Sequence, residues 1–138
     1  MMNHNATKER FEERRRDFKK CVASLEEAVS QPFNSFIRDS VIKRYECCWE
    51  TGWKLLKLWL SEQGVVTATP RDVWKEAFQN GLLSGDADRW TQAQRMRNLT
   101  VHTYDEATAD EVYQFVCRHA LALFLDLRQK AETWTFEV

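Results

Sequence analysis

The residues best suited to chemistry lie between Arg97 and Tyr104, where an arginine, an amide, a histidine and a tyrosine occur within eight positions. A guanidinium is always charged and can hold a phosphate at two points, and an imidazole can take up or release a proton near neutral pH. Arg97 and His102 therefore form a minimal set of groups for cleaving a phosphate ester without a metal ion. In a plainer alternative, Arg97 forms a surface ion pair with Asp105 or Glu106. His102 would then only bond the last carbonyls of its helix.

The spacing of these residues predicts which side chains point the same way. Residues five apart on a regular helix lie about 140° from each other around the axis, so Arg97 and His102 diverge. Asn98 shares a stripe with His102, whereas Arg97 shares a stripe with Tyr104. Two arrangements would bring the diverging groups together. Either the helix loosens before Asp105, or a two-fold dimer places two copies of the motif face to face.

The pattern Arg97-x4-His102-x-Tyr104, with Asn98 directly after the arginine, resembles the signature of the HEPN superfamily. It is similar in particular to HepT-like toxins, which are encoded beside a minimal nucleotidyltransferase and are also called nucleotidyltransferase substrate-binding proteins. The aromatic-rich run 45–57 is similar to the family's second helix, and Thr69-Pro70 looks like the start of a short helix in that family. The resemblance covers most of the chain.

This resemblance implies an all-α fold, an up-and-down four-helix bundle with an extra short helix, over a single HEPN-like domain of residues 1–138. It also implies a symmetric homodimer and a metal-independent endoribonuclease that needs no cofactor. His102 would move a proton to or from the ribose and the leaving oxygen, and Arg97 would stabilise charge on the phosphoryl group. Asn98 would orient the phosphate or the histidine. A structured RNA such as tRNA would fit the family as substrate.

Tyr104 matches the position at which, in HepT-like toxins, the partner nucleotidyltransferase attaches AMP and silences the nuclease. The resemblance therefore implies a type VII-like toxin–antitoxin pair. Because another enzyme must reach a phenol that it modifies, we expect Tyr104 to be exposed beside the cleft. Its plainer alternative is an ordinary amphipathic tyrosine at a helix end.

Two further functions stay open from the sequence. The chain could be a non-catalytic subunit that binds substrate for a separate nucleotidyltransferase, or a plain structural dimer. The sequence carries neither the Gly-Ser loop nor the paired-aspartate strand of a nucleotidyltransferase core, so transfer chemistry would belong to a partner. The nuclease hypothesis is preferred because it gives Arg97, His102 and Tyr104 distinct roles.

The composition is that of one folded helical domain. The chain has 138 residues, of which 43% are hydrophobic and 30% charged, with only four Gly and two Pro. This length can bury one core but not two. The formal net charge of −1 lacks the basic excess of a general nucleic-acid binder, so any contact with RNA must use a local patch.

The cysteines and the absence of apolar runs indicate the compartment. No apolar run is long enough for a membrane span, and no signal peptide is evident, so a soluble, cytoplasmic protein is expected. The cysteine and histidine spacing does not suit zinc. We therefore expect reduced, mostly buried thiols at all four cysteines, which are Cys21, Cys47, Cys48 and Cys117.

Apolar periodicity and capping residues predict five helices. The helices are expected from about Ala6 to Val29, from a cap at Asn34 or Ser35 to about Gln63, from Thr69-Pro70 to Asn80, from a cap at Asp86 through the motif, and from a cap at Thr108 through Leu127. Residues 1–5 and 132–138 are expected to be flexible tails.

The second of these helices is apolar on more than one side. Ile42, Trp53 and Leu55 lie off its main apolar stripe. A helix of this kind has more than one neighbour. The extra surface could pack against a second subunit, or the helix could be central and surrounded by its own chain.

Overall fold

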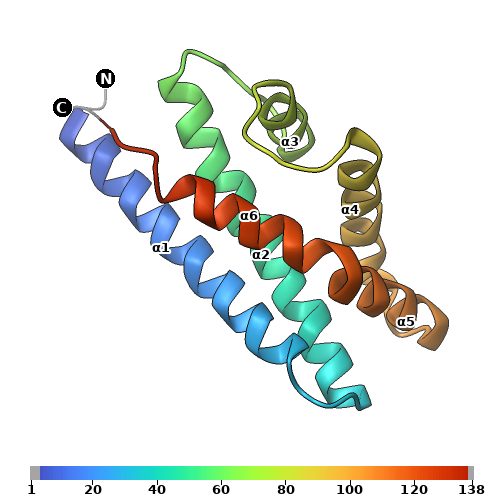
Figure 1. The fold of residues 1–138 in the computed structure, drawn as a ribbon. Coiled ribbons are helices and arrows are strands. Elements are labelled where there is room, and N and C mark those ends of the chain that lie inside the picture. Colours follow the sequence, from blue (N-terminus) through green and yellow to red (C-terminus); the bar gives the residue numbers. More distant parts are fainter. Residues whose placement is uncertain (1–3, 137–138) are drawn as a thin grey trace.

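The computed structural model describes residues 4–136, and within that range every regular element is helical (Figure 1). The elements are α1 (His4–Val29), α2 (Ser35–Glu62), α3 (Pro70–Gln79), α4 (Ala87–Leu99), the 3₁₀ turn η1 (Thr100–His102), α5 (Glu106–Phe115), the π-helical segment η2 (Val116–Ala120) and α6 (Leu121–Ala131). Because α5, η2 and α6 follow without a gap, they form one interrupted helix. The predicted all-α class is confirmed, whereas the homodimer stays a prediction.

The helices are arranged around α2. Helix α1 packs against both α2 and α6, and α3 and α4 lie on the side of α2 away from α1 (Figure 1). Ile42 and Leu55, two of the residues off the main stripe, are buried at 4% and 0% exposure, and Trp53 is half-buried. These side chains are therefore covered by other helices of the same chain, as in the alternative in which α2 is central. They offer little free surface to a second subunit.

Side-chain caps define where the helices begin. Asn34, Thr69 and Asp86 each accept a hydrogen bond from the backbone N–H three residues later, as predicted for caps. The expected cap of α5 was wrong, because Asp105 takes this position and Thr108 lies inside the helix. The Asp105 carboxylate accepts from both the backbone N–H and the hydroxyl of Thr108, at 3.2 and 2.7 Å. The helix therefore begins three residues before the position that a Thr108 cap would have given.

The C-terminal segment is packed rather than free, which corrects the expectation of a flexible tail from residue 132. Trp134 and Phe136 are 8% and 3% exposed. The Phe136 ring stacks on Phe11 with centroids 4.6 Å apart, and the Trp134 ring stacks on Trp59 at 5.0 Å. The alternating Thr133-Trp134-Thr135-Phe136 pattern thus turns two aromatic rings into the core.

The N-terminal expectation also changes, because α1 already includes residues 4 and 5. Residues 1–3 and 137–138, the rest of the expected tails, lie outside the described residues. In the described part of the chain, no helix is both long and apolar enough to cross a membrane.

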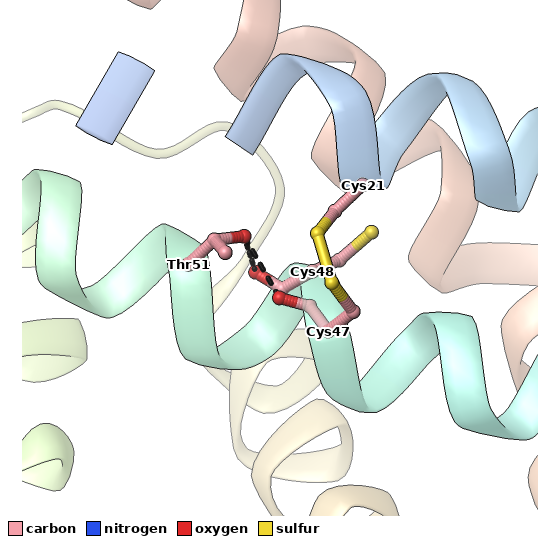
Figure 2. The surroundings of a disulfide bond; sticks show 4 residues. All are labelled: Cys21, Cys47, Cys48 and Thr51. Atoms are coloured by element: carbon pink, nitrogen blue, oxygen red, sulfur yellow. Dashed lines mark hydrogen bonds between the residues drawn. A yellow bond between two sulfur atoms is a disulfide. The ribbon is translucent and has the colours of Figure 1, made fainter. Parts of the chain in front are cut away.

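A disulfide joins α1 to α2 between Cys21 and Cys47 (Figure 2). The expectation of four reduced cysteines is therefore wrong for this pair. Helix packing brings their Cα atoms to 5.8 Å, although 26 positions separate them in the sequence. Cys48, whose thiol is free, is buried, and burial raises its pKa to about 12. Cys117 is also free.

Candidate functional site

Helix α4 is fixed to α2 one turn before Arg97. Tyr45 of α2 is fully buried, and its hydroxyl donates to the carbonyl of Ala93. In a regular α-helix that carbonyl also receives the backbone N–H of residue 97. Burial raises the pKa of Tyr45, so the phenol remains a proton donor. A core residue of α2 thus holds the turn that carries Arg97.

The guanidinium of Arg97 is half-buried, and only part of its hydrogen-bonding capacity is used. Its Nη2 donates to Glu50 Oε1 at 3.1 Å, and its Nη1 donates to Thr100 Oγ1 at 3.0 Å. Its Nε is buried and has no hydrogen-bond partner among residues 4–136. The second oxygen of Glu50 accepts from the indole N–H of Trp53 at 2.8 Å, which fixes the carboxylate.

The ion pair of Arg97 thus differs from the one considered for it. The expected partners were Asp105 or Glu106, but the carboxylate that Arg97 contacts is that of Glu50, on α2. A partner on another helix directs the guanidinium toward the body of the protein instead of along its own turn.

The helical segment winds more tightly after Leu99. One of the two predicted arrangements needed it to loosen there, so that the His102 side chain could turn toward Arg97. Helix α4 ends at Leu99 and continues as a 3₁₀ turn over residues 100–102. A 3₁₀ turn advances about 120° per residue, so it increases the divergence of Arg97 and His102. No hydrogen bond or ion pair joins these two residues within the described chain, and both His102 and Asn98 are exposed. The structure thus leaves His102 apart from Arg97, and within the described chain no hydrogen bond joins Asn98 to either residue.

The 3₁₀ turn is anchored at its start by Thr100. This residue is 6% exposed, and its hydroxyl donates to the carbonyl of Arg97 at 2.7 Å. The same oxygen accepts from the Arg97 guanidinium, so one threonine links the backbone and the side chain of that arginine.

The far end of the turn is held by Arg38 of α2. Arg38 is 5% exposed and binds Glu106 through two nitrogens, at 2.6 and 3.3 Å. It also donates to Asp110 at 3.1 Å. The hydrogen bonds that Arg38 donates to Glu106 and to Asp110 raise its pKa, and the guanidinium lowers the pKa of Glu106. The turn carrying His102 and Tyr104 is thereby fixed between two contacts with the protein body.

Tyr104 is 84% exposed, as expected for a residue that another enzyme must reach. Its ring lies 6.1 Å from that of His102 and nearly perpendicular to it, at 80°. The surface around the motif therefore presents a phenol, an imidazole and the amide of Asn98 next to the half-buried Arg97.

The sequence did not identify Arg38, Glu50 or Thr100 as parts of this site. Arg38 did carry a signal, because it lies on the apolar stripe of α2 three residues before Val41, where a charge must find partners. Glu50 and Thr100 gave no comparable signal. In the described part of the chain, no three His, Cys, Asp or Glu side chains are grouped so that they could hold a metal ion.

The described chain is thus an all-helical bundle that carries the Arg-x4-His-x-Tyr motif at the end of one helix. The chain belongs to the family described as nucleotidyltransferase substrate binding protein like, whose model matches residues 13–133. The resemblance inferred from the motif is thus confirmed at the level of the family.

Two solved structures and one curated relative are similar to the chain. A Thermus thermophilus protein of known crystal structure has a TM-score of 0.75 at 29% identity, covering 83% of this chain and 98% of that one. A Haemophilus influenzae structure, described as the fold of a substrate binding domain of a nucleotidyltransferase, has a TM-score of 0.64 at 23% identity, covering 95% and 100%, and this likeness shows the fold.

The curated relative, from Haemophilus influenzae, is named "Probable ribonuclease HepT". It is 32% identical over an alignment of 88 residues that covers 57% of this chain. The match spans 60% of the length of that relative.

Proposed function

We propose that the chain is a metal-independent endoribonuclease, the toxin of a type VII-like pair whose antitoxin is a minimal nucleotidyltransferase. The observation that carries this proposal is the state of Arg97. Its guanidinium is fixed by Glu50 and Thr100 through one N–H of Nη2 and one of Nη1, which leaves a second N–H on each of these atoms without a hydrogen bond in the described chain. Its sequence neighbour Asn98 is exposed. A fixed cation with unused donors suits a phosphate. The family and the relative named for ribonuclease activity support the same function.

The proposed reaction is cleavage of RNA by its own 2′-hydroxyl, which confines the enzyme to RNA. The 2′-oxygen forms a bond to phosphorus, and the bond to the 5′-oxygen breaks, which yields a 2′,3′-cyclic phosphate and a 5′-hydroxyl. His102 removes the 2′ proton or protonates the leaving oxygen. Arg97 stabilises the charge that develops on the phosphoryl oxygens, and Asn98 orients the phosphate.

This reaction requires a homodimer, because Arg97 and His102 of one chain diverge. In a two-fold assembly, Arg97 would face His102 of the partner subunit across a self-complementary surface. A large apolar side chain exposed within the motif supports such a surface. Val101 is 66% exposed. Its burial in a dimer would be favourable.

Tyr104 is the proposed site of regulation. The partner nucleotidyltransferase would transfer the AMP of ATP to the Tyr104 oxygen and release pyrophosphate, with the phenolic proton passing to solvent. The exposure of Tyr104 and its position beside His102 support this role. AMP on this oxygen would add bulk and negative charge where the RNA must enter. We place both proteins and their RNA, for which a tRNA is one candidate, in the cytoplasm.

Induced expression without the partner tests the nuclease proposal. The wild type should arrest growth and release RNA fragments that end in a 2′,3′-cyclic phosphate. Arg97→Ala and His102→Ala should lower cleavage by the purified protein at least about 100-fold. Arg95→Ala, which removes an exposed arginine of the same helix, is the matched control and should behave as wild type. Equal growth of all four strains, each with soluble protein, would show that the nuclease proposal is wrong.

Modification with purified partner and ATP tests the role of Tyr104. Mass spectrometry should find AMP on Tyr104 of the wild type, with loss of cleavage. Tyr104→Phe should still cleave RNA and should resist neutralisation. AMP found elsewhere on Tyr104→Phe, with neutralisation intact, would assign the regulation to another residue.

A second candidate function is a non-catalytic subunit that binds substrate for the nucleotidyltransferase. It is favoured by the lack of contact between Arg97 and His102 within one chain and by the description of the Haemophilus influenzae structure. In that case the wild type and His102→Ala would grow alike, and the partner's transfer rate would depend on this chain.

A further inference from the structure

A cavity of about 360 Å³ lies between α3 and α4, on the part of α4 that precedes the motif. Helix α3 lines it with Arg71, Trp74, Lys75 and Phe78, whose spacing places them on one face of the helix. Helix α4 contributes Trp90 and, one turn later, Gln94. This volume lies in the range of sites for small ligands.

The aromatic wall of the cavity is held in place before any ligand arrives. The rings of Trp74 and Trp90 are stacked, with centroids 5.2 Å apart and planes 22° apart. Trp74 also stacks on Trp49 at 4.5 Å, and the Trp90 indole donates to the carbonyl of Ser84 at 2.6 Å. Because Trp74 lies between Trp49 and Trp90 and only 4% of it is exposed, the two indoles of the cavity offer it their edges. The half-buried Phe78 is the more accessible ring, against which a flat heterocycle could stack.

The charge around the cavity is positive and unpaired. Arg71 and Lys75 are exposed, and neither forms an ion pair with any residue in the described range 4–136. The acids of α3, Asp72 and Glu76, do not line the cavity, and no other carboxylate of the described chain does.

The groove between α1 and α6 provides a contrast within the same molecule. It too contains cations, but Lys19 pairs with Glu132, and Arg128 lies 3.9 Å from Glu26. Lys19 and Arg128 are thus compensated by acids, although Lys20, which also lines the groove, has no ion pair in the described chain. Both cations beside the aromatic wall remain available to an anion.

We propose that the cavity between α3 and α4 binds a nucleotide, with the base against the ring of Phe78 and the edges of Trp74 and Trp90, and with the phosphate on Arg71 and Lys75. The amide of Gln94 can donate to and accept from the edge of the base. The nucleotide can be free or one unit of a single-stranded RNA.

Only the RNA form of this inference rests on the proposed nuclease function. Gln94 lies one helical turn, about 6 Å, before Asn98. A base in the cavity could therefore belong to a nucleotide close to the phosphate at Arg97. Binding of a free nucleotide requires no cleavage at all.

The test is titration of the full-length protein with AMP, followed by tryptophan fluorescence and calorimetry. AMP has no internucleotide bond, so nuclease activity does not enter the measurement. AMP should quench the fluorescence, and both adenosine and ribose 5-phosphate should bind more weakly, since each lacks half of the contacts. The double variant Arg71→Gln/Lys75→Gln should weaken AMP binding at least about tenfold through lost charge-assisted bonds.

The matched control is Arg16→Gln/Lys20→Gln, which removes two exposed cations with the same spacing on α1. It should change the affinity for AMP less than about twofold, since these cations lie outside the cavity. No binding of AMP by the wild type, or equal binding by both double variants, would overturn the proposal.

A pentanucleotide of RNA distinguishes the two sources, with His102→Ala as the host so that it is not cut. Tighter binding than AMP, weakened by Arg71→Gln/Lys75→Gln, would identify an RNA unit as the ligand. AMP binding that the RNA does not displace would identify a free nucleotide. If growth arrest fails while AMP still binds, the nuclease proposal fails and the nucleotide site stands.

Discussion

Arg38 is buried and Arg97 is half-buried, and both connect α2 to the motif region. The hydrogen-bonding capacity of their guanidiniums is satisfied to different degrees. Arg38 is 5% exposed and makes four hydrogen bonds to three carboxylates. The side chain of Arg97 is 23% exposed, bonds one carboxylate and one hydroxyl, and has a buried Nε without a partner in the described chain. Arg38 thus uses almost all of its N–H donors, whereas Arg97 has N–H donors that make no hydrogen bond within the described chain.

The difference indicates different roles for the two guanidiniums. One positive charge against three carboxylates leaves the Arg38 cluster with a formal charge of −2. Such a cluster stabilises the junction of α2 and α5 and repels a phosphate. The Arg97–Glu50 pair is neutral, so an arriving phosphate meets less repulsion there. RNA should therefore approach the motif from the side of Arg97 and not from the side of Glu106.

The largest effect that separates the two arginines is on stability. Arg38→Ala should lower the free energy of unfolding by about 2 kcal/mol, because it removes several charge-assisted bonds from a buried position. Arg97→Ala should cost less than half of that, since it also removes an unsatisfied buried donor. Urea unfolding followed by circular dichroism measures both.

Arg95→Ala is the control for this comparison. Arg95 is 63% exposed and pairs with Glu111 at 3.4 Å, so its loss should change stability by less than about 0.5 kcal/mol. If Arg97→Ala destabilised the fold as much as Arg38→Ala, Arg97 would be a structural arginine and the contrast would disappear.

The parts of the fold that were predictable depend on local signals. The caps Asn34, Thr69 and Asp86 act on backbone groups three residues away, so a short stretch of sequence contains all the information. The cap of α5 was predicted wrongly because only Thr108 was considered, although the Asp105 carboxylate three residues earlier accepts from the Thr108 N–H.

The contacts that build the site depend on tertiary packing and could not be predicted from spacing. Arg38 and Glu106 are 68 positions apart, and Arg97 and Glu50 are 47 apart. The Cys21–Cys47 disulfide likewise needs the packing of α1 on α2. The motif could be located from sequence, but the direction in which Arg97 points is determined by a carboxylate on another helix.

Glu50, whose carboxylate positions Arg97, should have a smaller effect on RNA cleavage than Arg97 itself. Glu50→Gln removes the charge that positions the guanidinium, and it leaves an oxygen that can still accept from Trp53. RNA cleavage should slow about tenfold, which is less than for loss of Arg97 itself. The initial rate of cleavage of a labelled RNA gives the measurement.

Glu46→Gln, one turn earlier on α2 and equally half-buried, is the matched control and should leave the rate unchanged. Both variants should unfold within about 1 kcal/mol of wild type. A Glu50→Gln enzyme with wild-type activity would mean that Arg97 is positioned without its carboxylate.

The smallest effect concerns the pH dependence of the Arg38 cluster. Hydrogen bonding to Arg38 lowers the pKa of Glu106 from its ordinary value of 4.5. A carboxyl whose pKa is lowered by folding stabilises the folded state above its unfolded pKa, and this contribution is lost as pH falls through the folded value. Glu106→Gln should therefore be less stable than wild type at about pH 7, and the difference should vanish in acid below the lowered pKa.

The effect is small because the Glu106 side chain is 77% exposed, so solvent screens its attraction to Arg38. Urea midpoints of both proteins between about pH 7 and pH 3 measure it. Glu111→Gln, which breaks the exposed pair with Arg95, should show a smaller difference at neutral pH. A difference for Glu106→Gln that stayed constant across this range would mean that Arg38 is held by Asp110 and Asp39 alone, and that the turn bearing Tyr104 is not anchored through Glu106.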